Sequence, residues 1–194
     1  MKKILLSLLL TFLSSALGFA KYTASSKFFR VNAIYIDEVI EGPNGNESGE
    51  GVTAEFAFIF SDDDYFYASL GLEAGYLESD ADGFALNIDM ELIPVFANYT
   101  VGGDIEDVDL FWEAGFGLGF IYLDYQQSFL GFSRSDDDIV VGGQAFGRLG
   151  YEFTDSIALL VGARYIKTED AKFSGSNAGD LSSLAFDLGL RVMF

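Results

Sequence analysis

Hydrophobic and polar residues alternate along the last stretch of the chain. In residues 184–194 every second residue is bulky and apolar: Leu184, Phe186, Leu188, Leu190, Val192 and Phe194. The residues between them are small, polar or charged, among them Asp187 and Arg191. Because consecutive side chains of a β-strand point to opposite faces, this pattern predicts a strand with one apolar face and one small or charged face.

The same alternation recurs along most of the chain. It predicts eight strands, at residues 27–36, 51–61, 65–77, 84–99, 110–123, 139–153, 157–167 and 184–194. Each run is long enough to supply the roughly 9–11 residues of a tilted membrane-crossing strand. An even number of such strands suits an antiparallel barrel in which each strand pairs with the next.

Alternation alone does not decide which face of such a barrel meets water. A lipocalin-like barrel would bury the apolar face and expose the polar one. Here the less hydrophobic face is rich in Gly, Ala and Ser with isolated charges, as suits the narrow interior of eight strands. Lysine is also missing from the strand interiors, since Lys21, Lys27, Lys167 and Lys172 lie at strand ends or in loops. We therefore expect an all-β fold, an eight-stranded antiparallel up-and-down transmembrane β-barrel.

Aromatic residues of the apolar face gather at two levels. Phe66 and Tyr76 bound the third strand, and Trp112 and Tyr122 bound the fifth. Ten residues at roughly 3.3 Å each, tilted by about 40°, span about 25 Å, the height of an outer-membrane apolar band. The predicted aromatic girdles comprise Phe66, Tyr76, Trp112, Tyr122, Tyr165 and Phe194.

The predicted connections alternate in length. Polar segments at residues 37–50, 78–83, 124–138 and 168–180 follow the odd-numbered strands, tight turns at 61–64 and 154–156 follow the second and sixth strands, and a segment of intermediate length at 101–109 follows the fourth. Outer-membrane barrels have short periplasmic turns and longer external loops, which places both termini in the periplasm. Pro94 should then lie near the periplasmic end of the fourth strand, where a missing N–H donor is tolerated.

The first twenty residues read as an export signal. Lys2 and Lys3 precede an apolar run at residues 4–13, and residues 18–20 form a small-x-small cleavage site. The apolar run is too short for a membrane-spanning helix, which needs roughly 20 residues. We expect residues 1–20 to be removed, leaving residues 21–194 as one barrel domain in the outer membrane.

The predicted inner face carries a set of charged residues from all eight strands. It comprises Arg30, Glu55, Glu73, Asp89, Glu91, Glu113, Arg148, Arg164, Asp187 and Arg191, with Ile88, Met90 and Leu92 placed on the outer face of the fourth strand. Unpaired charges would be costly in a narrow interior, so we expect a salt-bridged plug. Glu113 should meet Arg148, and Glu55 or Glu73 should meet Arg164. The alternative is a gated ion path or catalytic carboxylates.

Composition narrows the possible chemistry. The chain has no Cys and no His, and its formal charge of −19 becomes −21 without Lys2 and Lys3. A His-assisted nucleophile is therefore excluded, and so acidic a surface repels nucleic acid. We expect neither enzyme activity nor a cofactor.

The acidity of the chain reflects solubility or a saline habitat, or else a dedicated cation-binding role. The acidic runs at 62–64 and 136–138 lack the spacing of a calcium loop and are read as solvated turns.

These residues together resemble the small outer-membrane β-barrel family that includes opacity-type surface antigens and the OmpA and OmpX barrels. The resemblance covers essentially the whole mature chain and is carried by residues 93–99, 113–120 and 184–194. Val192 replaces the aromatic residue that the family usually has third from its end. The resemblance implies a monomer surrounded by outer-membrane lipid and lipopolysaccharide, inserted by an assembly machinery that recognises the last strand.

The sequence therefore predicts an outer-membrane surface or structural protein without an open pore. Any recognition would use its four acidic external loops, because loops on a rigid scaffold carry binding residues. Phe129, Leu130 and Phe132 form the candidate contact patch, although they could equally rest on outer-leaflet lipid. The alternative function is a narrow channel or a transporter of small hydrophobic molecules.

Overall fold

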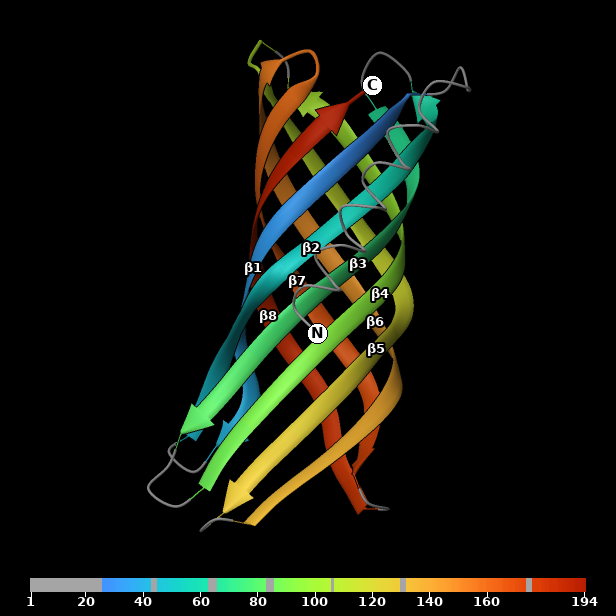
Figure 1. The fold of residues 1–194 in the computed structure, drawn as a ribbon. Coiled ribbons are helices and arrows are strands. Elements are labelled where there is room, and N and C mark those ends of the chain that lie inside the picture. The colour runs from blue at the N-terminus through green and yellow to red at the C-terminus, as the bar shows by residue number, and fades with distance from the viewer. Residues whose placement is uncertain are drawn as a thin grey trace.

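The computed structural model describes residues 26–42, 45–62, 66–82, 86–105, 107–129, 132–173 and 176–194. Within these ranges the chain forms β1 (Lys27–Gly42), β2 (Gly45–Asp62), β3 (Phe66–Asp82), β4 (Leu86–Ile105), β5 (Leu110–Phe129), β6 (Phe132–Thr154), β7 (Ile157–Phe173) and β8 (Ser176–Met193). Each strand pairs antiparallel with the next, and β1 also pairs with β8, so the sheet closes into the predicted barrel (Figure 1). In the described ranges, no helix is both long and apolar enough to cross a membrane.

The first and last strands close the ring in a continuous register. Phe28 pairs with Met193 and Ile36 pairs with Ala185. Beyond this ladder, the Phe194 N–H donates to the Lys27 carbonyl at 3.0 Å and the Lys27 N–H donates to the Phe194 carbonyl at 3.2 Å. A closed ring leaves no sheet edge with unpaired backbone groups.

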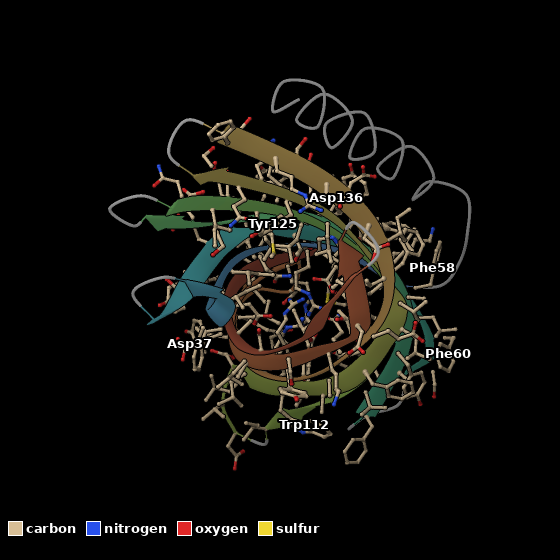
Figure 2. The ribbon with its side chains drawn as sticks, turned by 90° about the horizontal axis from the view of Figure 1, so that it is seen from below. Asp37, Phe58, Phe60, Trp112, Tyr125 and Asp136 are labelled. Atoms are coloured by element: carbon tan, nitrogen blue, oxygen red, sulfur yellow. The ribbon has the colours of Figure 1, made fainter. Side chains whose placement is uncertain are left out.

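The barrel has two distinct ends. We call the end where β1 begins and β8 finishes the terminal end, and the opposite end, with the β1–β2, β3–β4, β5–β6 and β7–β8 connections, the hairpin end. The terminal end lies at the top of Figure 1 and the hairpin end at the bottom. Figure 2 views the barrel from the hairpin end, with Phe58, Phe60 and Trp112 pointing outward while other side chains fill the centre.

The strands extend much further toward the hairpin end than the sequence predicts. Residues 124–138 were expected to form a loop, yet β5 continues to Phe129, which pairs with Phe132 at the start of β6. Most of residues 37–50 and 168–180 likewise belongs to strands. The sequence prediction fails here because polar residues suit a strand whose outer face meets water, and strand propensity depends strongly on such context.

Pro94 lies inside β4 rather than near its end. The fourth strand continues to Ile105, beyond the predicted limit at residue 99. Pro94 pairs with Ile121 of β5, but the β3–β4 ladder skips from Ala74–Val95 to Leu77–Leu92 on its other side. Proline cannot donate a ladder hydrogen bond, so the interruption coincides with the missing donor.

The outer face of the central barrel is apolar, as predicted. Its exposed large side chains include Phe58, Leu70, Leu72, Phe116, Leu118, Phe120, Val141, Leu149, Val161, Tyr165, Phe186 and Leu188. Two of the predicted girdle residues lie together on the outer face of β3 and β5: Phe66 pairs with Gly103, which pairs with Trp112, and the Phe66 and Trp112 rings are 6.1 Å apart. We call this surface, from the Phe66–Trp112 level to the Tyr76–Tyr122 level, the apolar belt.

A charge placed in the apolar belt should destabilise the barrel. Leu118 lies on β5 between Trp112 and Tyr122, and 67% of it is exposed. We expect Leu118→Arg to lower the unfolding free energy in lipid bilayers by about 2–4 kcal/mol, because arginine is costly near the bilayer midplane. Urea titration measures the change. Gln126→Arg is the matched control, since Gln126 is exposed on β5 beyond Tyr122; equal effects of both substitutions would contradict the position of the belt.

Candidate functional site

Eight charged side chains meet in the interior of the barrel on the terminal side. They are Arg30 of β1, Glu55 of β2, Glu73 of β3, Glu113 of β5, Arg148 of β6, Arg164 of β7, and Asp187 and Arg191 of β8, and all are buried. We call this set the ion-pair layer. Strand alternation directs these residues inward while their neighbours in sequence face outward. Four arginines balance four carboxylates, as the high cost of transferring a net charge out of water requires.

Glu113 is the centre of one half of the layer. Its carboxylate accepts hydrogen bonds from Arg30 and, at 3.0 Å, from Arg191, and it lies 3.7 Å from Nη1 of Arg148. The hydroxyl of Tyr67 also donates to Glu113 Oε1 at 2.6 Å. The expected Glu113–Arg148 contact is therefore present as an ion pair, but Arg30 and Arg191 make the closer contacts.

Asp187 is the centre of the other half. Its Oδ2 atom accepts from Arg164 Nη2 at 2.6 Å and from Arg148 Nε at 3.3 Å. Arg164 also donates to Glu73 at 2.7 Å, which matches one of the two pairings expected for it. Arg148 touches both Glu113 and Asp187, so it joins the two halves into one network.

Two amides connect the carboxylates of neighbouring strands. Asn98 donates to Glu55 at 3.1 Å and to Glu73 at 2.8 Å. Gln144 donates to Glu73 at 2.8 Å and accepts from Arg164 at 3.0 Å. Neither amide, nor Tyr67, was predicted from the sequence to join this network. For Tyr67 and Gln144 the available signal was their inward position on predicted strands, because a polar group buried in a barrel needs a hydrogen-bond partner. Asn98 gave no such signal, since it shares the face of Ile88 and Leu92, which the sequence predicts on the outside.

Aromatic rings support the arginines from the same inner face. The guanidinium of Arg148 lies 4.0 Å from the ring centroid of Phe146, and that of Arg191 lies 3.9 Å from the ring of Phe111. A cation over an aromatic face is stabilised by about 2 kcal/mol or more when desolvated. These rings therefore offset part of the cost of burying the charges.

Apolar side chains fill the interior on the hairpin side of the ion-pair layer. Twelve buried residues pack into one cluster: Ile34, Ile36, Leu77, Ile88, Leu92, Phe96, Ile121, Leu123, Val140, Ile166, Ala171 and Ala185. We call this cluster the apolar layer. On the terminal side two smaller clusters form around Phe28 and Phe111. The ion pairs thus lie between apolar groups.

Asp89 and Glu91 do not join the ion-pair layer, which corrects the expectation for β4. Asp89 is exposed and Glu91 half-buried on the outer face, whereas Ile88 and Leu92 are buried inside. This part of β4 lies beyond the apolar belt, where the outer face meets water and the interior is apolar. The alternation of hydrophobic and polar residues is real, but its direction is reversed there.

The carboxylates beyond the belt form a row across five strands. Glu50 pairs with Glu78, Glu78 with Glu91, Glu91 with Asp124, and Asp124 with Asp137. We call these five residues the acidic row. A shallow pocket of about 240 Å³ lies over its centre, lined also by Asp80, Asp89, Met90 and Gln126. Among the described residues no group of acidic side chains has the geometry to hold a metal ion.

The predicted contact patch is only partly described. Phe132 is 80% exposed at the start of β6, close to the tip of the β5–β6 hairpin. Leu130 and the side chain of Phe129 lie outside the described residues. The exposed ring of Phe132 is therefore the described part of this patch.

Comparisons with known proteins identify the fold. No protein-family model and no curated protein matches the sequence. Neisserial surface protein A is similar in structure with a TM-score of 0.53 and 14% identity, over 87% of this chain and 97% of that one. Ail, the attachment invasion locus protein of Yersinia pestis, gives 0.55 and 12%, over 89% and 100%. A major outer membrane protein from Thermus thermophilus gives 0.58 and 12%, over 87% and 99%. The chain therefore has the fold of the small outer-membrane β-barrels.

Removing one arginine from the ion-pair layer should destabilise the barrel. Arg164→Ala takes away the guanidinium that pairs with Glu73 and leaves this carboxylate buried, so we expect a loss of roughly 3–5 kcal/mol of unfolding free energy, typical of a broken buried pair. Thermal and urea unfolding in detergent measure it. Arg134→Ala, which removes an exposed arginine of β6, is the control; an unchanged transition for Arg164→Ala would contradict a stabilising role for the network.

Neutralising the middle of the acidic row should stabilise the barrel. Like charges directly opposite one another on neighbouring strands are unfavourable. Because Glu91 faces both Glu78 and Asp124, we expect Glu91→Gln to raise the unfolding free energy by roughly 0.2–1 kcal/mol at low salt. The gain should shrink in 1 M NaCl, where charges are screened beyond about 3 Å. Asp155→Asn, at the β6–β7 turn, is the control, and a gain independent of salt would rule out repulsion as the cause.

Proposed function

We propose that this protein is exported, loses residues 1–20, and acts at the cell surface as an outer-membrane barrel with no open pore. The observation that carries this proposal is the filled interior. A neutral ion-pair layer and an apolar layer occupy the described centre of the barrel (Figure 2). An eight-stranded barrel is just wide enough to be filled by its own side chains, so little room is left for a solute path.

The long hairpins supply the surface for recognition. Strand β5 continues well beyond Tyr122, to Phe129, which is roughly 23 Å of strand at about 3.3 Å per residue. Phe132 exposes its ring near the tip of the β5–β6 hairpin. A large exposed aromatic side chain on a rigid support is a typical anchor of a protein interface. The names of the Neisserial surface protein and of the Yersinia attachment protein agree with a role at the cell surface.

Transport of small hydrophobic molecules is the second candidate function. It is favoured by one observation: the β3–β4 ladder is interrupted beside Pro94, at the level where Leu77, Leu92 and Phe96 of the apolar layer line the interior. An interrupted ladder is the part of the wall where strands separate most easily. A molecule dissolved in the membrane would meet apolar side chains there.

One complementation experiment separates the two functions. A knockout strain receives the wild-type gene, Phe132→Ser or Pro94→Val, and is scored for binding to a basement-membrane matrix and for uptake of a hydrophobic dye. We expect Phe132→Ser to reduce matrix binding at least several-fold without changing uptake, because the anchor ring is lost. Phe153→Ser, which changes an exposed Phe of β6 at the terminal end, is the control.

The opposite result would favour transport. If the knockout takes up less dye, and Pro94→Val behaves like the knockout while Phe132→Ser behaves like wild type, the surface role is wrong. Immunoblots of outer-membrane fractions confirm equal amounts of each variant.

A further inference from the structure

The ion-pair layer and the apolar layer do not close the barrel equally well. On the terminal side, Arg191 of the ion-pair layer also pairs at 3.0 Å with Glu152, whose side chain is 38% exposed. The charged network therefore continues past the small apolar clusters around Phe28 and Phe111 to solvent at that end. On the hairpin side, the network is covered by the apolar layer, whose twelve members are at most 6% exposed.

The apolar layer spans nearly the whole circumference. Its residues come from β1, β3, β4, β5, β6, β7 and β8. The missing strand, β2, presents Gly51 at this level, and a side chain there would collide with the backbone carbonyl of Tyr76, since a Cβ would lie 2.1 Å from it. Glycine at this position therefore lets β2 and β3 lie close together where β2 contributes no apolar side chain. Phe96, Leu92 and Ile121 are each 1% exposed in the layer.

The two layers oppose an entering ion by different means. In the ion-pair layer, both Nη atoms of Arg148 and the Oδ1 atom of Asp187 have no hydrogen-bond partner among the described residues. These polar atoms could replace part of the water that a permeating ion must shed. The apolar layer offers no such replacement, and transfer of a charge into an apolar region is far more costly than its transfer between polar groups. Hydrophobic constrictions close channels in this way, by excluding water.

We propose that the apolar layer, rather than the ion-pair layer, is the permeability barrier of this barrel against ions and small hydrophilic solutes. This inference rests on the proposed function, in which the barrel is sealed, and assigns the seal to named residues. The ion-pair layer then holds the strands together, while Phe96, Leu92 and their neighbours keep water from connecting the two ends.

Planar-bilayer recordings with two matched double variants test the proposal. Phe96→Ala with Leu92→Ala empties part of the apolar layer. Glu73→Ala with Arg164→Ala removes two long side chains from the ion-pair layer and keeps its charge balanced. We expect wild type and the Glu73–Arg164 variant to be silent, and discrete conductance steps to appear in the Phe96–Leu92 variant alone. Heat-dependent migration on gels and circular dichroism establish that each variant forms the barrel.

Each other outcome has a definite meaning. Steps from the Glu73–Arg164 variant, alone or together with the Phe96–Leu92 variant, would overturn the assignment of the seal but leave a sealed wild type. Silence of both folded variants would overturn it as well. Steady conductance of the wild-type barrel would refute the sealed interior, and with it the proposed function. If the Phe96–Leu92 variant does not fold, Ile121→Ser replaces it, because a hydroxyl in the apolar layer should admit water with little loss of volume.

Discussion

The hydrogen bonds between β1 and β8 convert a sheet into a ring, and the rest of the structure depends on that closure. Once the ring is closed, its strand number fixes an interior just wide enough for side chains. Every inward residue must then fit among the others, and every inward charge must find a partner. The balance of four arginines with four carboxylates, the paired amides of Asn98 and Gln144, and the small residues at inward positions such as Gly150, beside the buried ring of Phe111, all follow from that width.

Alternation along the sequence predicted the strands well but the environment of each face only in part. Its direction was correct within the apolar belt, where the outer face is hydrophobic, except on β4, where the predicted alternation places Asn98 outside although it is buried. Beyond the belt the same alternation has the opposite meaning, as Asp89 and Leu92 show on β4. The change is marked in the sequence by adjacent apolar residues that face opposite sides, as at Leu92–Ile93 and Ile139–Val140. Alternation with a period of two cannot reveal by itself which face is apolar, since apolar and polar residues alternate both within the belt and beyond it.

The sequence predicted most of the candidate site where the only question was which face of its strand a residue occupies. It did not predict which residues meet across the barrel. The alternation of side chains along the strands placed Arg164 and Glu73 on the inner face, and their opposite charges then suggested the contact between them. The contact of Arg30 with Glu113 joins β1 to β5, across the interior. Which residues meet across the axis depends on strand tilt and stagger, which are properties of the closed ring. Tyr67 was missed although it lies on the predicted inner face. An aromatic residue on a largely apolar strand does not indicate that its hydroxyl group joins a buried ion pair.

The acidic row has a consequence for how deeply the molecule sits in a bilayer. Five carboxylates in one pairing row form a border directly beyond Tyr76 and Tyr122, and the row is inclined to the membrane plane because the strands are tilted. Sinking by even a few ångströms would draw this border into hydrocarbon, whereas an apolar edge would tolerate such a displacement. Lipids around the barrel must therefore adjust their thickness to the protein, because bilayer deformation costs only fractions of a kcal/mol per ångström of mismatch. On the side formed by β2 to β6, the charges of the acidic row therefore set how deeply the barrel is immersed, and the bilayer adjusts its thickness to that depth.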